Sequence, residues 1–585
     1  MNKGYTVEKG QLILISLLKK SGIKRIIASP GTTNITFVAS LMNDPYFEIY
    51  SAADERSAAY MACGMAIETK EPVVLTCTGA TASRNYIPAM TEAFYRKLPI
   101  LAVTATQNIN KVGHLVPQVI DRSHQISDTY VHSVQIAVPR DKDDEWDATI
   151  KLNRAILALK HHGGGPVHIN LSTNYTRDFS VQELPDVVKI NRYTPLDKLP
   201  DIPAGRVGIR VGNHCSFSKA ETDAIEEFCV KYGAVVFCEA CSNYAGEHRV
   251  FAALSSHQGY RKDIFATDVL IHIGETASYG ADSTACTKQV WRVSEDGELR
   301  DLMRKLSNVF EMPEIYFFKQ YTAKPDPYSA TRDFDYLKKC IVDYNDIHTS
   351  VPELPFSNVW IAQQTAEKLP EDSILHLGIL HSQRCWSLFD AKGELRNHTF
   401  VNTGGFGIDG CLSTVIGGSI ANPEKLHFIV IGDLAFFYDM NSLGNHNIGN
   451  NLRILLINNG CGTEFKNYNH FAASFGNDAN EYMAAAGHYG NRSPQLVRHY
   501  AQDLGFKYLS ATNKEEYLNA LTEFITSDKC DRPILFEVFT NPEDESEAIK
   551  IANTLRIYTP TTNEIIKAKV YSSTIGSVKK IFGKS

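Results

Sequence analysis

The stretch LHFIVIGDL, residues 426–434, decides the fold, and a second stretch, LRILLINNG at residues 452–460, repeats its plan. Each contains an apolar run with the length of a buried strand, and polar breaks flank both runs. Gly432 lets the chain turn sharply and brings backbone N–H groups close to a ligand. The residues between the strands, 434–447, are predicted to form a helix whose N-terminus can hold an anion.

Asp433 and Asn459 stand where these two predicted strands end. The carboxyl ends of parallel strands meet at one edge of an open α/β sheet, and such sheets place their sites there. A carboxylate and an amide carbonyl beside a phosphate suit a hard octahedral cation such as Mg²⁺. A plain β-α-β unit with a turn Asp and a turn Asn would show the same residues, so this stretch alone fits both interpretations.

Composition and charge narrow the class of protein. The hydrophobic content of 43% and the charged content of 21% are typical of a globular protein, and 585 residues allow three or four domains. The net charge of −7 argues against a nucleic-acid surface, and no apolar run has the length of a bilayer span, so we expect neither nucleic-acid nor membrane partners. We expect the twelve cysteines to be reduced thiols in a cytoplasmic protein.

Strand-like and helix-like segments alternate along most of the chain, which predicts an α/β fold with parallel sheets. In the first part we expect strands at 24–28, 47–51, 72–77, 98–105 and 163–171. Stretches rich in proline or without periodicity, at 174–205 and 346–356, separate the parts. We therefore predict three doubly wound parallel-sheet domains and a basic C-terminal tail, at residues 1–180, 190–345, 355–545 and 546–585.

Glu55 connects the first domain with the late stretch. Taken alone it would be a solvated carboxylate at a helix N-terminus. However, the run from Tyr50 to Gly64, followed by residues 73–80 and then Asn85, resembles the pyrimidine-binding domain of thiamine-diphosphate (ThDP) enzymes. Asp433 and Asn459 resemble the diphosphate–metal motif of the same enzymes. The joint resemblance implies the ThDP-enzyme fold, with ThDP and Mg²⁺ as cofactors.

The resemblance also implies the site residues. Glu55 would hydrogen-bond N1′ of the aminopyrimidine, and Asp433, Asn459 and Cys461 would surround the metal. Ile408 would hold the cofactor in a bent posture. The full set of predicted cofactor-binding residues is Gly31, Thr32, Thr78, Gly79, Asn85, Gly407, Ile408, Gly432, Asp433, Leu434 and Asn459.

Within these enzymes, the order of a pyrimidine-binding domain first and a diphosphate-binding domain last resembles the decarboxylase and acetohydroxyacid synthase group. Ser29-Pro30-Gly31 and Gly407-Ile408-Asp409-Gly410 resemble SEPHCHC synthase of the menaquinone pathway, and Thr403-Gly404-Gly405 resembles acetolactate synthase. The resemblance implies an active-site role for Gln118 and a 2-oxo acid carboxylate at Arg384. His114 would be either a proton shuttle or a polar loop residue.

Three departures decide the predicted substrate. SEPHCHC synthases carry arginine where this chain has Thr33, Gln107 and Thr403. Arginine binds carboxylates with two parallel hydrogen bonds, which threonine cannot do. We therefore predict a carboligase that decarboxylates a small 2-oxo acid, with pyruvate favoured, and transfers the acyl group to an acceptor. The alternatives are SEPHCHC synthase itself, acting on 2-oxoglutarate and isochorismate, a decarboxylase without ligation, and a non-catalytic ThDP-fold subunit. The resemblance further implies a homodimer or homotetramer.

Overall fold

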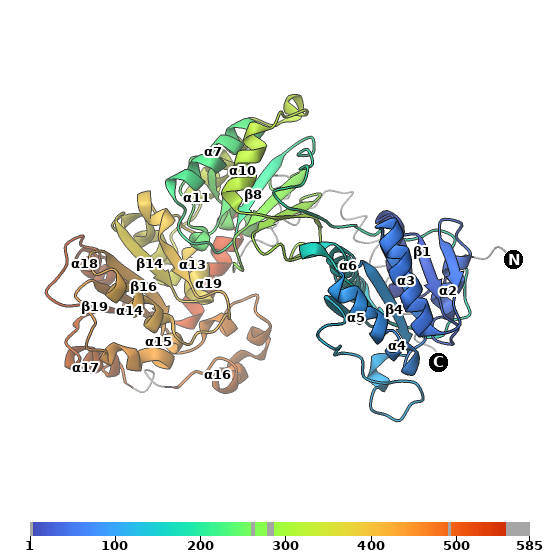
Figure 1. Cartoon of the computed structure of the whole chain (residues 1–585). Coiled ribbons are helices and arrows are strands. Elements are labelled where there is room, and N and C mark those ends of the chain that lie inside the picture. The colour runs from blue at the N-terminus through green and yellow to red at the C-terminus, as the bar shows by residue number, and fades with distance from the viewer. Residues whose placement is uncertain (1–3, 259–263, 278–285, 489–492, 557–585) are drawn as a thin grey trace, which may run out of the picture. The chain divides into compact units, whose positions relative to one another are not determined.

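The computed structural model describes residues 4–258, 264–277, 286–488 and 493–556 (Figure 1). The chain divides into two compact units. The first contains residues 1–199 and 295–312, and the second contains residues 200–294 and 313–585. Each unit is described by itself below.

A six-stranded sheet with the order β2-β1-β3-β4-β6-β5 forms the centre of the first unit. All of its neighbouring strands pair in parallel. The strands are β1 (Arg25–Ala28), β2 (Glu48–Ser51), β3 (Val73–Cys77), β4 (Ile100–Thr106), β5 (His132–Ile136) and β6 (Val167–Ser172). The sequence predicted five of these strands, and β5 was missed.

Helices cover both faces of this sheet. Along β3, Val74 belongs to one apolar cluster, whereas Val73 and Leu75 belong to another, because alternate side chains of a strand point to opposite faces. The first cluster includes residues of α1 (Lys9–Lys20), α2 (Ile35–Met42) and α6 (Lys142–Ala158). The second includes residues of α3 (Glu55–Thr69) and α5 (Ile87–Tyr95). This is the predicted doubly wound arrangement.

The predicted linker at 174–205 is wrong in one respect, because it contains strand β7 (Asn191–Tyr193). This strand pairs in parallel with β13 (Leu306–Glu311). The error arose because three residues between prolines are too few to show a period, and the partner lies more than a hundred residues further along the chain.

The second unit contains two groups of parallel strands. One has the order β10-β9-β8-β11-β12, and the other is a six-stranded sheet with the order β15-β14-β16-β17-β19-β18. The strands of the first group are β8 (Val207–Val211), β9 (Val235–Cys238), β10 (Arg249–Phe251), β11 (Val269–Ile273) and β12 (Val290–Ser294). Those of the sheet are β14 (Ser373–Leu377), β15 (Thr399–Val401), β16 (Leu426–Gly432), β17 (Leu452–Asn458), β18 (Lys507–Ala511) and β19 (Ile534–Phe539).

Helices connect these strands. In the first group they include α7 (Lys219–Tyr232), α10 (Glu314–Ala323) and α11 (Tyr336–Thr349). Around the six-stranded sheet they include α12 (Asn358–Thr365), α13 (His381–Trp386), α14 (Cys411–Ala421), α15 (Asp433–Asp439), α17 (Leu496–Asp503), α18 (Lys514–Phe524) and α19 (Pro542–Asn553). One buried apolar cluster joins these helices to the sheet.

Two predicted boundaries in this unit differ from the structure. Helix α15 ends at Asp439 instead of residue 447, and a 3₁₀ turn, Met440–Gly444, follows it. The predicted tail begins at 546, inside α19. This helix buries Ala548, Ile549 and Ala552 against the sheet, so it belongs to the folded unit. The basic remainder, 557–585, lies outside the described residues.

The structure confirms the predicted fold class, with three sets of parallel strands and flanking helices. All twelve cysteines are free thiols. Among the described helices, none combines the length and the apolar composition that a membrane crossing requires.

Candidate functional site

Three adjacent strands of the six-stranded sheet deliver the late site residues to one edge. Strands β14, β16 and β17 are neighbours in the sheet. Strand β14 runs into α13, which carries Arg384, while β16 ends directly before Asp433 and β17 directly before Asn459. The strand order therefore gathers these three residues at one edge, as predicted for Asp433 and Asn459.

Asp433 is a buried carboxylate, only 5% exposed. Its two oxygens accept hydrogen bonds from the backbone N–H groups of Leu434, at 2.8 Å, and Gly460, at 2.6 Å. Burial raises the pKa of the Asp433 carboxyl to about 7, although these amides lower it. A bound cation would stabilise a carboxylate held in this way, because the positive charge favours the ionised form. The backbone N–H of Leu434 donates to the Asp433 side chain, so this N–H is already engaged within the protein.

Asn459 supplies the second oxygen of the predicted metal site. Its Oδ1 is buried and has no hydrogen-bond partner among the described residues. An unpaired buried acceptor beside a buried carboxylate fits a hard cation with oxygen ligands. Cys461 fits less well as a side-chain ligand, because burial raises the pKa of its thiol to about 11 and Mg²⁺ prefers oxygen.

A cavity of about 400 Å³ opens at this edge. The predicted cofactor residues Gly407, Ile408, Gly432, Asp433, Leu434 and Asn459 all line it, with Cys461. A Cβ added at Gly432 would meet no other atom within 4 Å, so a side chain there would project into open space that a ligand could use. Ile408 is half-buried and packs against the apolar core while it lines the cavity. The donor set and the space thus fit a metal-bound diphosphate.

Glu464 is a lining residue that the sequence reasoning missed. It lies in a 3₁₀ turn, Thr463–Lys466, shortly after Asn459, and it forms an ion pair with Arg384. The predicted carboxylate-binding arginine is therefore already paired with a carboxylate of the same chain. The sequence offers no clue to this pair, since a residue in a short turn has no period that would show its direction.

A second buried charge network reaches the wall of the cavity, because His381 is one of its lining residues. His381 Nε2 lies 3.0 Å from Glu545 Oε2 and 3.7 Å from Cys385 Sγ. Burial lowers the pKa of the His381 imidazole, but the charges and hydrogen bonds of Cys385 and Glu545 more than offset this and raise it to about 10. Glu545 also accepts from the backbone N–H of Asn358 and the hydroxyl of Thr540. The network ties α12, α13 and α19 together at the cavity wall.

Glu55 lies in the first unit, where it opens helix α3. Asp54 caps this helix by accepting a hydrogen bond from the backbone N–H of Ser57 at 2.7 Å, so Glu55 occupies the first helical turn. Its side chain is half-buried, and its charge acts on the buried groups Cys77 and Tyr86. Glu55 is thus held on a rigid element at the carboxyl end of β2, next to the apolar interior of the first sheet.

Gly31, Thr78 and Gly79 meet at the carboxyl edge of the first sheet. A Cβ at Gly31 would lie 2.5 Å from Thr78 Cβ, so the close approach of these two turns requires glycine. The hydroxyl of Thr33 contacts that of Thr78 at 2.6 Å and donates to the Ala105 carbonyl at 2.9 Å. These contacts fix the turns that the resemblance assigns to cofactor binding.

The remaining predicted residues of this unit are exposed: Thr32, Asn85, His114 and Gln118. His114 and Gln118 belong to one loop after β4, and Gln118 adopts a positive φ of 64°. Its backbone carbonyl would lie 3.4 Å from a Cβ at Gly79, which places this part of the loop at the sheet edge. The structure therefore brings Gln118, Gly79 and Thr33 into one region, and leaves the His114 side chain exposed.

Arg122 is a second residue that the sequence reasoning missed. Its side chain is 3% exposed, and Nη2 donates to Asn170 Oδ1 at 2.6 Å. Burial lowers the pKa of the guanidinium to about 10. Its Nε and Nη1 have no hydrogen-bond partner within the described part of the chain. The first sheet edge thus carries a buried cation, although not at Thr33 or Gln107.

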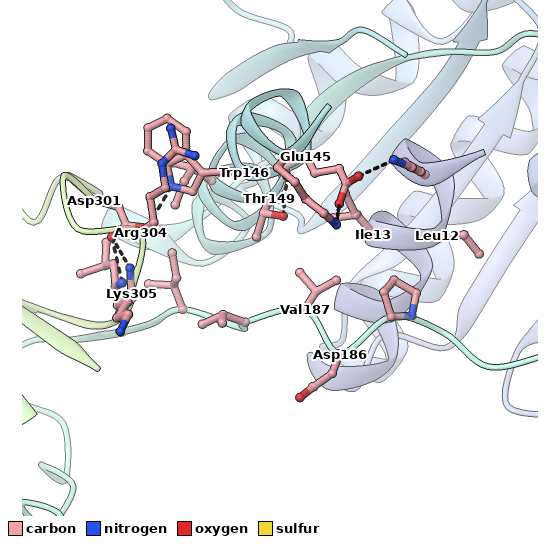
Figure 2. A pocket seen from close by; sticks show the side chains of 17 residues that line it. Leu12, Ile13, Glu145, Trp146, Thr149, Asp186, Val187, Asp301, Arg304 and Lys305 are labelled. Atoms are coloured by element: carbon pink, nitrogen blue, oxygen red, sulfur yellow. Dashed lines mark hydrogen bonds and ion pairs between the residues drawn. The ribbon is translucent and has the colours of Figure 1, made fainter. Parts of the chain in front are cut away.

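Another cavity in the first unit, of about 500 Å³, is lined by α1, α6 and the segments 185–190 and 301–306 (Figure 2). Two of its labelled carboxylates, Glu145 and Asp301, point to neighbouring groups of the protein. Glu145 pairs with Lys9 and Lys142, and Asp301 accepts from the indole of Trp146 and the backbone N–H of Lys305. None of the residues predicted from the sequence lines this cavity, so we place the candidate site at the sheet edges instead.

Comparison with known proteins identifies the relatives of this chain. Residues 8–126 match the family model "Thiamine pyrophosphate enzyme, N-terminal TPP binding domain". A 2-succinyl-5-enolpyruvyl-6-hydroxy-3-cyclohexene-1-carboxylate synthase of Phocaeicola vulgatus is 30% identical over 568 residues, which cover 93% of this chain and 98% of that protein. Enzymes of the same name from Bacteroides thetaiotaomicron and Flavobacterium psychrophilum are 29% and 28% identical, and cover 93% and 90% of this chain.

Proposed function

Because this chain belongs to the family of thiamine-diphosphate enzymes that includes the 2-succinyl-5-enolpyruvyl-6-hydroxy-3-cyclohexene-1-carboxylate (SEPHCHC) synthases, we propose that it decarboxylates a 2-oxo acid and joins the remaining acyl group to an acceptor. Its cofactors are thiamine diphosphate and a divalent metal. When bound, the cofactor supplies a carbon nucleophile for the 2-oxo group and holds the electron pair that CO₂ leaves behind. The single observation that carries this proposal is the buried pair of Asp433 and the unpartnered Asn459 Oδ1.

The residues of the site would have separate roles in this proposed reaction. Asp433 and Asn459 would hold the metal through oxygen, and Gly432 would leave room for the diphosphate. Ile408 would support the cofactor from the cavity wall. Glu55 would share a proton with N1′ of the aminopyrimidine from its fixed position on α3. A non-catalytic subunit is the weaker alternative, because such a protein would not need Glu55, Asp433 and Asn459 together.

For the substrates we propose 2-oxoglutarate and isochorismate first, because the similar enzymes are named as synthases of the corresponding product. A specific observation favours a second candidate, a small 2-oxo acid such as pyruvate with a different acceptor. Thr33 and Thr403 are buried and hydrogen-bonded to the Ala105 carbonyl and the Asn213 side chain, and Gln107 accepts from Lys111. Three positions that hold arginine in SEPHCHC synthases are therefore engaged within this protein.

Mass spectrometry of the products separates these candidates. The protein with ThDP and Mg²⁺ would receive 2-oxoglutarate plus isochorismate in one reaction, and pyruvate plus aldehyde or ketone acceptors in another. A succinyl adduct of isochorismate supports the first candidate, and an acetyl adduct supports the second. Free aldehyde without any adduct would indicate decarboxylation without ligation, and the absence of every product would refute the proposal.

We also propose a homodimer as the smallest active assembly, as the resemblance implies. Exposed apolar side chains on the first unit support an interface there, including Tyr60 and Met61 of α3 and Met42 at the end of α2. A native mass spectrum dominated by dimers or tetramers is expected, and a monomer that turns over substrate would contradict this proposal.

A further inference from the structure

Glu464 stands between the cofactor cavity and Arg384. It lines the cavity together with Asn459, Cys461 and Phe465, and it is 8% exposed. One of its oxygens, Oε1, pairs with Nη1 of Arg384. The other oxygen, Oε2, is buried and has no hydrogen-bond partner among the described residues. The carboxylate is thus bound on one side and unsatisfied on the other.

The pair changes what the cavity presents to a substrate. Arg384 is not among the residues that line the cavity, whereas Glu464 is. A 2-oxo acid that approaches Arg384 therefore first meets a negative charge, and its carboxylate must compete with Glu464 for the guanidinium. Removing one partner from a partly buried ion pair leaves the other free to take a new ligand.

We propose that Glu464 is a specificity-determining residue, which occupies Arg384 as an internal counter-ion and which the carboxylate of the donor must displace. The inference rests on the proposed use of a 2-oxo acid, and it adds a residue that sets how tightly such acids bind. The same negative charge penalises a donor with two carboxylates more than a donor with one, because the second carboxylate enters the same cavity. Glu464 therefore tunes the choice between 2-oxoglutarate and pyruvate.

The test replaces Glu464 by glutamine, which has the same shape without the charge. In Glu464→Gln, KM for the donor acid should fall by about tenfold, the size expected for one partly screened charge near a protein surface. The fall should be larger for 2-oxoglutarate than for pyruvate, while kcat changes little. Glu464→Asp keeps the charge and should stay close to the wild type. Glu481→Gln removes the same charge from an exposed position on the nearby short helix α16 (Ala479–Tyr482) and serves as the matched control.

A binding measurement makes the outcome independent of turnover. Protein assembled with Mg²⁺ and an unreactive analogue of thiamine diphosphate would be titrated calorimetrically with pyruvate and with 2-oxoglutarate. Tighter binding of both acids to Glu464→Gln than to the wild type and to Glu481→Gln supports the inference. Equal or weaker binding would overturn it, since Glu464 would then be neutral toward the acid or would itself hold the substrate. If the wild type binds 2-oxo acids but releases no CO₂, the proposed function fails while this inference is still decided by the titration.

Discussion

The two sheet edges that carry the predicted site differ in the charge of their buried groups. At the first edge, Thr33, Thr78 and Gly79 bond to one another, Glu55 sits half-buried in a capped helical turn, and the buried cation of Arg122 has two nitrogens without a partner among the described residues. At the second edge, the Asp433 carboxylate is buried with a raised pKa, and Asn459 Oδ1 has no partner among the described residues. The second edge therefore gains from a bound cation, whereas the first needs none. This difference separates cofactor retention, at the second edge, from activation by Glu55 at the first.

The largest expected effect comes from the first edge. Glu55→Gln should lower turnover by about a thousandfold, as for the loss of a general acid–base group, while ThDP affinity stays within a few-fold of the wild type. Kinetic assays and calorimetric titration of the same preparation would measure both. Glu68→Gln removes an exposed carboxylate from the same helix and should keep full activity. An unchanged rate in Glu55→Gln would refute the assigned role.

A substitution at the second edge should instead weaken cofactor binding. Asp433→Asn should weaken Mg²⁺-dependent ThDP binding by about a hundredfold, because the metal loses a charged oxygen ligand. Titrating ThDP at fixed Mg²⁺ would measure the loss. Asp503→Asn, at the exposed end of α17, is the control. Wild-type affinity in Asp433→Asn would place the metal elsewhere and would remove the distinction between the two edges.

The charge network at the second edge should contribute to stability in a pH-dependent way. Glu545→Gln should cost about 2 kcal/mol, because the charged His381 loses an ionised hydrogen-bond partner. The folded pKa of His381, about 10, lies above its usual value of 6.5, so this stabilisation is complete below pH 6.5 and disappears as the pH rises through 10. Urea unfolding of both proteins at pH 6 and pH 10 would test this. An equal difference at both pH values would contradict the account.

The smallest effect is expected at the exposed loop of the first edge. Gln118→Ala should raise KM for the acceptor by about tenfold and leave KM for the donor unchanged. A tenfold change corresponds to the loss of one hydrogen bond worth roughly 1 kcal/mol or a little more. His114→Ala distinguishes the two interpretations of that histidine. A fall in kcat would indicate a proton shuttle, whereas no change would indicate a polar loop residue.

The sequence predicted the sheets and the site edge because both depend on local patterns. Apolar runs such as 426–431 indicate buried strands, and parallel strands place their carboxyl ends at one edge of the sheet. These two patterns were enough to locate Asp433 and Asn459. The ion pair of Glu464 with Arg384 depends on the direction of a side chain in a short turn, and no sequence pattern predicts that direction. The contact between His381 and Glu545 joins residues that are 164 positions apart.

Other differences have the same origin. Helix α19 was divided at 545 because the sequence changes character there, although its apolar residues 548, 549 and 552 still lie on one face. The expectation of reduced thiols did not single out the spacing Cys238-Glu239-Ala240-Cys241, and the structure shows why this spacing matters little for reactivity. Both thiols are buried, and burial raises the pKa of Cys238 to about 12.

The most direct test of the central claim is the release of CO₂ from 2-oxo acids by the purified wild-type protein, measured with and without ThDP and Mg²⁺. We expect CO₂ from 2-oxoglutarate or pyruvate only when both cofactors are present, and about a thousandfold slower release from Glu55→Gln under the same conditions. The absence of CO₂ from every 2-oxo acid in a broad panel, in a preparation that binds ThDP, would contradict it.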